Sequence, residues 1–384
     1  MPTETAVQTE VDVTVVRVDA VGSLLRPPEL VTAFAAADEG ALDTEGLRAV
    51  QDEAVRQVIA QQEAHGLPVL TDGEFRRRHF MESFAEIAGY AHGRTAPVGV
   101  AVVTEEKTGV DGGPPMARGR RVRTPVIERI QLLRNRPLEE FGFAQGLTRR
   151  VVKASLITPA RIVEAYDADG SREVYPSVDD FLADVVRIQR EMIEQLIDAG
   201  CRYIHIDAPD YAAYLDERSL EAMREQGHDP AARLQRALAA DNAVIEGFDG
   251  ATFGLHVCRG NFRGRWAREG AYDAIAESLY NGLGHQRLLL EYDSDRAGGF
   301  ESLRFVPAGK IAVLGLISTK SPQVETVDEL QRRIEEAARF LPLEQLAISP
   351  QCGFASVLDG NPLDQETQWR KLDVMMETAS RVWG

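Results

Sequence analysis

Eight short apolar segments alternate with amphipathic stretches along this 384-residue chain, and this alternation constrains the fold more than any other feature. Some segments are apolar at consecutive positions, as in Leu288–Leu290. Continuous apolarity is typical of strands that are buried on both faces, as in a parallel sheet. The eight predicted strands are Val13–Ser23, Pro68–Phe75, Val151–Thr158, Tyr203–Pro209, Ala251–Cys258, Arg287–Asp293, Ile311–Ser318 and Leu346–Gly353.

The stretches between these strands are predicted to be helices. In Val178–Gly200 apolar residues recur every three or four positions, and Gly200 suits a helix end. Alternating strands and helices indicate an α/β fold with a parallel sheet, and eight units favour a closed (β/α)8 barrel, the TIM barrel, over an open sheet. No G-x-G-x-x-G motif follows the first strand, which disfavours a dinucleotide-binding sheet. The other predicted helices are Leu47–Gly66, Ala231–Phe248, Trp266–Leu283 and Val327–Leu341.

We predict that residues 1–384 form one catalytic barrel with an insertion at 93–124, between the helix after the second strand and the third strand. The insertion carries Gly-Gly-Pro-Pro and a basic run, and Val100–Thr104 can pair with Arg121–Thr124 as a hairpin. It either folds over the mouth of the barrel or forms a surface loop.

The charge of the chain excludes some functions. Acidic residues outnumber basic ones, 60 against 43, and the net charge is −17, which argues against binding a nucleic-acid backbone. No apolar run is long enough for a membrane helix, and the polar N-terminus lacks the pattern of a signal peptide, so we expect a cytoplasmic protein. The sequence does not indicate an oligomeric state.

Residues capable of chemistry follow the predicted strands at their carboxyl ends, where barrel enzymes build their active sites. A simpler interpretation, that polar residues mark where strands stop, explains one or two of them. They are Gly22, Ser23, Asp72, Glu74, Asp207, His256, Cys258, Glu291, Asp293, Ser318, Thr319, Lys320 and Cys352.

His256 and Cys258 stand two apart on a predicted strand, so their side chains share a face. An imidazole and a thiolate suit Zn²⁺, although a buried cysteine beside a core histidine would show the same spacing. Cys352 and Glu291, at the ends of nearby strands, can complete a four-ligand site. We assign Cys201, ahead of a strand, to core packing.

At these residues the sequence resembles a known family, the catalytic domain of cobalamin-independent methionine synthase, and especially its short, single-domain relatives. The motifs occur in the family's order and span nearly the whole chain. They are V-G-S-L-L-R-P at 21–27, T-D-G-E-F at 71–75, I-D-A-P at 206–209, H-V-C-R-G-N at 256–261, L-E-Y-D at 290–293 and S-P-Q-C-G-F at 349–354.

The resemblance implies a (β/α)8 barrel with a catalytic zinc that serves methionine biosynthesis by transferring a methyl group to the thiol of homocysteine. It makes His256, Cys258 and Cys352 fixed zinc ligands and Glu291 the fourth, exchangeable ligand. It also implies that Glu74 and Asp207 bind the amino group of homocysteine, and that the backbone at Gly22 and Ser23 binds its carboxylate.

The sequence departs from this family in two ways. Lys320-Ser321-Pro322 stands where the family has a catalytic histidine in H-S-P, and a lysine is not an equivalent proton shuttle near neutral pH. The chain also has no room for the N-terminal barrel with which the full-length enzymes hold a polyglutamyl folate. The methyl donor therefore stays open between a folate, a methylated corrinoid protein and another metabolite.

The sulfur-rich ligand set favours activation of a thiol, since zinc coordination can deprotonate a thiol outright. We expect Asp293, Arg296, Arg259 and Lys320 to contact the donor, although salt bridges at strand ends explain the two arginines equally well. Three alternatives stay open: a zinc-dependent alkyltransferase for another thiol such as coenzyme M, a metal-free barrel decarboxylase, and a non-catalytic zinc-binding barrel.

Overall fold

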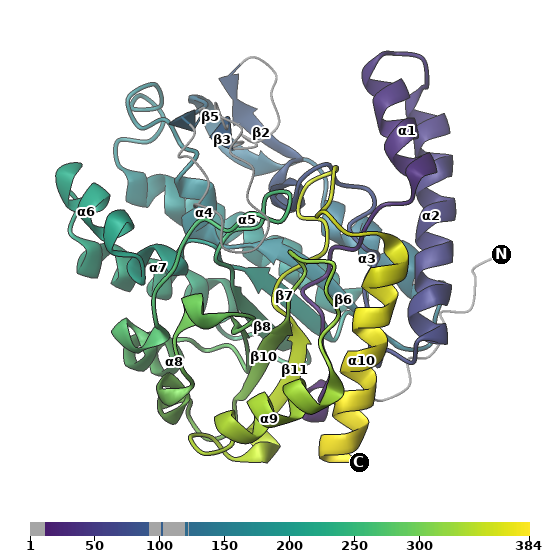
Figure 1. Ribbon diagram of the computed structural model, residues 1–384. Helices are drawn as coiled ribbons and strands as arrows, with labels where there is room; N and C mark the ends of the chain where they lie inside the picture. The colour runs from purple at the N-terminus through teal and green to yellow at the C-terminus, as the bar shows by residue number, and fades with distance from the viewer. Residues whose placement is uncertain (1–11, 92–100, 103–119, 122) are drawn as a thin grey trace.

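The computed structural model describes residues 12–91, 101–102, 120–121 and 123–384. A parallel sheet of seven strands curls through its centre, with helices on the outside (Figure 1). These strands are β1 (Val69–Leu70), β6 (Val151–Ile157), β7 (Tyr203–Asp207), β8 (Thr252–Val257), β9 (Arg287–Glu291), β10 (Ile311–Ile317) and β11 (Leu346–Pro350). They follow one another around the sheet in chain order. The structure thus confirms the predicted α/β class and seven of the eight predicted strands.

The first predicted strand, Val13–Ser23, is not a strand, yet part of it takes the eighth place in the ring. Val18 forms an isolated parallel bridge with Ile348 of β11. Beyond it, the N–H of Leu24 donates to the carbonyl of Gly73, just after β1, at 3.1 Å. The segment 17–24 therefore closes the curled sheet between its last and first strands, as in a (β/α)8 barrel.

The first residues of the predicted strand Val13–Ser23 form a turn whose backbone is held by a side chain. Val13–Val15 form a short 3-10 turn, η1. The buried guanidinium of Arg287 donates to the carbonyls of Val13 and Val16, at 2.8 and 3.1 Å. Two carbonyls that a strand would have used in a ladder are thus satisfied by an arginine, which the apolar pattern did not reveal.

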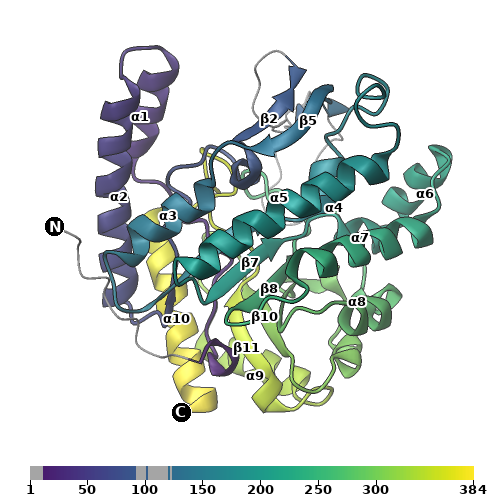
Figure 2. The same ribbon diagram turned by 180° about the vertical axis from the view of Figure 1, so that it is seen from behind.

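Helices cover the outer face of the sheet, and Figure 2, the view from behind, shows α5 running across the sheet on the side of the viewer, near β7. Gly200 follows α5 with φ of 94°, the left-handed conformation expected at a helix end. No helix among the described residues is long and apolar enough to cross a membrane. The helices are α1 (Pro28–Asp38), α2 (Thr44–Ala64), α3 (Arg136–Gln145), α4 (Pro159–Val163), α5 (Val178–Asp198), α6 (Glu217–Glu225), α7 (Pro230–Ile245), α8 (Ala276–Gly282), α9 (Val327–Ala337) and α10 (Gln365–Trp383).

The predicted helix Trp266–Leu283 is largely wrong, because α8 covers only its last part. The chain before α8 bonds to other loops instead. The N–H groups of Ala267 and Arg268 both donate to the carbonyl of Arg259, and the N–H of Gly270 donates to the carbonyl of Arg296. Gly270 also has φ of 130°, which no helix contains. This stretch therefore ties the loops after β8 and β9 together.

The insertion at 93–124 lies before the helix α3 (Arg136–Gln145), whereas we predicted that it would lie after the helix that follows the second strand. Strands β2 (Ile87–Tyr90) and β5 (Val126–Leu132) pair antiparallel between β1 and α3. The start of α3 is fixed by the cap Asn135, whose side chain accepts from the N–H of Leu138. Within 93–124, β3 (Ala101–Val102) pairs antiparallel with β4 (Arg120–Arg121), and most other residues lie outside the described part.

Alternation along each strand decides which residues face the inside of the barrel. On β9, Leu288 and Leu290 belong to the main core, whereas Leu289 joins a separate small cluster with residues of β10 and β11. Because side chains alternate, Arg287 and Glu291 share the inner face with Leu289. The inner face of β9 thus carries a cation at its amino end and a carboxylate at its carboxyl end.

Candidate metal site

The carboxyl ends of β7, β8 and β9 bring polar side chains to one end of the barrel. Asp207, the last residue of β7, pairs in register with His256 of β8. The Nε2 atom of His256 lies 3.9 Å from Oδ1 of Asp207 and 3.8 Å from Oε1 of Glu291. These three side chains therefore meet at the end that the sequence pattern indicated.

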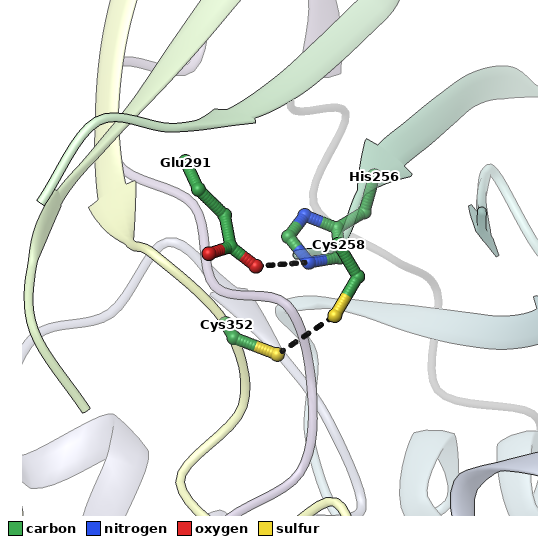
Figure 3. Close-up of side chains that lie close together, drawn as sticks. All are labelled: His256, Cys258, Glu291 and Cys352. Carbon is green, nitrogen blue, oxygen red and sulfur yellow. Dashed lines mark hydrogen bonds and ion pairs between the residues drawn. The ribbon is translucent and has the colours of Figure 1, made fainter. Parts of the chain in front are cut away.

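Two cysteines complete this group (Figure 3). Cys258 follows β8, and Cys352 follows β11, with 3.7 Å between their sulfur atoms. One ligand atom from each of His256, Cys258, Glu291 and Cys352 lies within 4.8 Å of the other three, and all four residues are buried. The structure thus brings together all four predicted ligands, on segments up to 96 residues apart in the chain.

The contact between the two sulfur atoms favours the charged form of Cys352 only, because the same contact, together with burial, raises the pKa of the Cys258 thiol. The N–H of Gly260 donates to the sulfur of Cys258 at 3.3 Å. The bond from Cys258 lowers the pKa of the Cys352 thiol well below its usual range, and the His256 ring adds to this against the effect of burial. Burial opposes protonation of His256, but Cys352 and Asp207 outweigh it and raise the pKa of His256 to about 9.

The unsatisfied atoms of the group fit a metal ion. Among the described residues, the two ring nitrogens of His256 have no hydrogen-bond partner. The Oε2 atom of Glu291 has none either. A buried polar atom without a partner costs about 1–3 kcal/mol. Two thiols, an imidazole and a carboxylate are the donors of a four-coordinate metal ion. The group can therefore hold a metal, which would satisfy these atoms at once.

Predicted substrate residues lie beside this group. Ser23 is next to Gly353, the neighbour of Cys352, so closely that a Cβ on Gly353 would come within 1.9 Å of the Ser23 hydroxyl. Gly22 has φ of 148°, and its carbonyl accepts from the Thr71 hydroxyl at 2.7 Å. The segment closing the barrel therefore presents Gly22 and Ser23 to the metal group.

Glu74 is buried and Asp207 is partly buried, and both carboxyl groups have capacity to accept hydrogen bonds. The Oε1 atom of Glu74 accepts from the Ser155 hydroxyl at 2.9 Å, while Oε2 of Glu74 and Oδ1 of Asp207 have no hydrogen-bond partner in the described part of the chain. Burial raises the pKa of Glu74, although Arg77 opposes it. Burial and the nearby Cys352 raise the pKa of Asp207 to about 8, against the effect of His256.

The four residues expected on the donor side differ in their contacts. Arg296 forms a salt bridge with Asp293 at 2.7 Å, as the alternative interpretation predicted, and approaches Oε2 of Glu291 at 3.8 Å. Arg259 is fully buried with its guanidinium 4.4 Å from the centre of the Tyr272 ring, and it forms no ion pair with the described residues. Lys320 is buried, and its charge acts on Glu291 and Cys352.

Two supporting residues escaped the sequence analysis. The Tyr272 hydroxyl accepts from the backbone N–H of Glu291 at 3.0 Å and so fixes the end of β9. Tyr272 lay inside the wrongly predicted helix, so no signal singled it out. Gly353 leaves the space that Ser23 fills, and its place directly after Cys352 in the motif was an available signal.

The comparisons with known proteins agree with this geometry. A family model described as "Cobalamin-independent synthase, Catalytic domain" matches residues 18–380. The chain is 34% identical to the uncharacterized protein YxjG of Bacillus subtilis, covering 96% of this chain and 94% of that protein. It is 24% identical to a methionine synthase of Pyrococcus abyssi, covering 94% and 91%.

A solved structure shares the fold. It is described as a putative vitamin-B12 independent methionine synthase from Listeria monocytogenes, with a TM-score of 0.72 and 24% identity, covering 95% of this chain and 97% of that one.

Proposed function

Because this chain belongs to the family of the cobalamin-independent synthase catalytic domain, we propose that it is a zinc-dependent methyltransferase that converts homocysteine to methionine. One observation carries the proposal: His256, Cys258, Glu291 and Cys352 gather within 4.8 Å, next to two carboxyl groups that each have a buried oxygen atom without a hydrogen-bond partner among the described residues. The four-residue group suits a metal ion that binds sulfur ligands, and the two carboxyl groups suit an ammonium group.

His256, Cys258 and Cys352 would hold the zinc as fixed ligands, and Glu291 would be the fourth ligand. A free thiol has a pKa of about 8.5 and is mostly protonated at pH 7, whereas its thiolate is the nucleophile. Zinc held by this ligand set would supply the acidifying charge that keeps a substrate thiol deprotonated. The N–H of Arg259, which donates to Oε1 of Glu291 at 2.8 Å, would keep that carboxylate oriented.

The amino-acid part of homocysteine would be held by groups around the metal site. Glu74 and Asp207 would accept hydrogen bonds from the ammonium group through Oε2 and Oδ1, which have no donor among the described residues. The backbone at Gly22 and Ser23 would hold the carboxylate. An ammonium group between these two acids would pair with both of these oxygen atoms.

The methyl donor would be 5-methyltetrahydrofolate or another activated methyl compound. Lys320 stands where the family has a histidine, and it lies buried beside the metal group. We place Lys320, Arg259, Arg296 and Asp293 on the donor side of the site.

The proposal is tested with Cys352→Ser, with Cys201→Ser as the matched control. Cys201 is buried far from the site, and its sulfur donates to the carbonyl of Tyr203, which a serine hydroxyl can also do. We expect the C352S chain to lose bound zinc and homocysteine methylation by more than the ~10–100-fold typical of residues that only support a ligand. C201S should keep both.

Bound zinc is measured by metal analysis of the purified chain, and methylation with homocysteine and coenzyme M over several methyl donors. Full zinc and full activity in C352S would sink the proposal. Turnover of coenzyme M without turnover of homocysteine would reassign the acceptor.

A further inference from the structure

Three cationic side chains, those of Arg259, Arg296 and Lys320, lie near Glu291 of the candidate metal group. Arg259 directly follows Cys258, Arg296 follows β9, and Lys320 follows β10. Arg259 is 0% exposed and Lys320 is 5% exposed. Each of the three acts on Glu291: Arg296 at 3.8 Å from Oε2, the other two through their charge.

Two of these cations lack the partners that buried charges normally have. Within the described residues, the three guanidinium nitrogens of Arg259 have no hydrogen-bond partner. The Nζ atom of Lys320 has none either. The ring of Tyr272 offers Arg259 a cation–π contact, which does not satisfy its N–H groups. Burying an unpaired charge is costly, so such groups are normally paired or hydrogen-bonded.

The candidate metal site does not supply hydrogen-bond partners for Arg259 and Lys320. Two thiolates, Cys258 and Cys352, balance a divalent zinc ion, and Arg296 already pairs with Asp293. Glu291 and Asp207, which lie 3.8 and 3.9 Å from Nε2 of His256, can balance the charges of Arg259 and Lys320. Neither carboxylate accepts a hydrogen bond from these two side chains, so their donors stay unpaired within the described residues.

We propose that Arg259 and Lys320 form an anion-binding subsite that holds a carboxylate or phosphate group of the methyl donor. The planar fork of Arg259 suits two-point contact with such a group, and Lys320 supplies a point charge. The inference rests on the proposed function in one respect, because the proposed function is what identifies the anionic molecule as the methyl donor. Because Arg259 directly follows the candidate metal ligand Cys258, the subsite would hold the donor near the metal-bound thiol of homocysteine, which would receive the methyl group.

The test is a calorimetric titration of the zinc-loaded full chain with inorganic phosphate and, separately, with acetate, in the absence of any methyl donor. We expect saturable binding of at least one anion. Arg259→Met and Lys320→Met should each weaken it, by about 10- to 100-fold for Arg259, since a charge-assisted hydrogen bond is worth that much. Arg259→Lys should fall between, because it keeps the charge without the fork.

Arg263→Met is the matched control in the same loop, because Arg263 is exposed and pairs with Asp359 at 2.7 Å. It should bind the anions as the unaltered chain does. Zinc content is measured for every variant. Unchanged anion binding in R259M, even with zinc lost, would overturn the proposal, because the arginine would then serve the metal site alone. No saturable binding in the unaltered chain would also overturn it.

A second titration is done with homocysteine present. We expect phosphate affinity to be unchanged, since the acceptor occupies the side of Glu74 and Asp207. Mutual exclusion of phosphate and homocysteine would place the anion in the acceptor's subsite and overturn the assignment to the donor. Because no methyl transfer is measured, failure of the methyltransferase proposal and failure of this one are seen separately.

Discussion

Glu74 adopts a backbone conformation that residues other than glycine rarely take. Its φ is 58°, and such strain costs of order 1–3 kcal/mol. Neighbours hold it there: the N–H of Glu74 donates to Asp72 Oδ1 at 3.0 Å, and Arg26 donates to the Glu74 carbonyl at 3.0 Å. The conformation places a carboxyl group with a free oxygen at the site, which suits a binding role.

The charge of Glu74 should matter more than its shape. Glu74→Gln keeps the backbone and the Ser155 contact but removes the negative charge from the ammonium site. We expect the KM for homocysteine to rise by about 10- to 100-fold, the value of a hydrogen bond to a charged group, with zinc content unchanged. Glu139→Gln, at a partly exposed position on α3 away from the metal group, is the control. A KM for homocysteine equal to that of the unaltered chain would show that Glu74 does not bind the ammonium group.

Asp72 gives a pH dependence of stability. Burial and the nearby Glu140 raise its pKa to about 7, against Arg77, from 3.8. A carboxyl group with a raised folded pKa favours folding below its unfolded pKa, and this contribution is lost as the pH rises through the folded value. Asp72→Asn, which keeps the acceptor for the Glu74 N–H, should therefore be more stable than the unaltered chain at pH 8 but not at pH 4. Urea unfolding at both pH values measures this, and equal effects at the two would contradict it.

The four metal-site residues could be predicted because each one ends or follows a strand whose apolar pattern is clear. His256 and Cys258 share a face by simple alternation, and the parallel order places Glu291 and Cys352 nearby. The contact of Tyr272 with β9 could not be predicted in this way. It depends on how an irregular loop returns to the barrel, which no periodic pattern encodes.

At the scale of elements, the strands that are buried on both faces were predictable, and the irregular segments were not. The sequence of β10 is apolar throughout, and that of β9 is apolar at its three central positions, so their type follows from this continuous apolarity. The stretch 266–271 has helical periodicity, but its N–H groups find partners in the loops after β8 and β9. Tertiary hydrogen bonds thus override a local pattern there.

Gly315 shows how closely two strands must approach near the metal site. A Cβ at this position of β10 would lie 2.7 Å from Cα of Gln351 and 3.0 Å from the carbonyl of Leu290. Gly315→Ala should therefore push the chain before Cys352 outward, lower the unfolding free energy by about 1–3 kcal/mol and weaken zinc binding. Urea unfolding and zinc content measure the two effects.

Gly142→Ala on α3 is the matched control, since a Cβ there meets nothing within 4 Å. It should raise the unfolding free energy by roughly 0.5–1 kcal/mol through helix propensity. A G315A chain with unaltered stability and zinc content would show that the strands can separate freely.

At the scale of the whole molecule, buried ionic contacts secure the end of the barrel opposite the metal group. Asp19, on the closing segment, accepts from Lys153 of β6 at 2.8 Å and from Arg287 of β9 at 3.1 Å. Tyr203 of β7 donates to the same carboxylate at 2.6 Å. Asp19 thus joins three strands to the segment that completes the ring. The α/β barrel was predictable from its repeating strands, but this closure was not, because it uses side chains in place of a strand ladder.

Arg287→Met should therefore destabilise the entire fold. The change would leave Asp19 with one cation fewer and would free the carbonyls of Val13 and Val16. Breaking a buried ion pair costs about 3–5 kcal/mol, whereas Arg263→Met, which breaks the exposed pair with Asp359, should cost less than about 1 kcal/mol. Urea unfolding measures both. The zinc content of the folded R287M chain should stay unchanged, because the metal group lies at the other end of the strands. Equal stability of the R287M and R263M variants would instead show that the segment 17–24 is held by its backbone contacts alone.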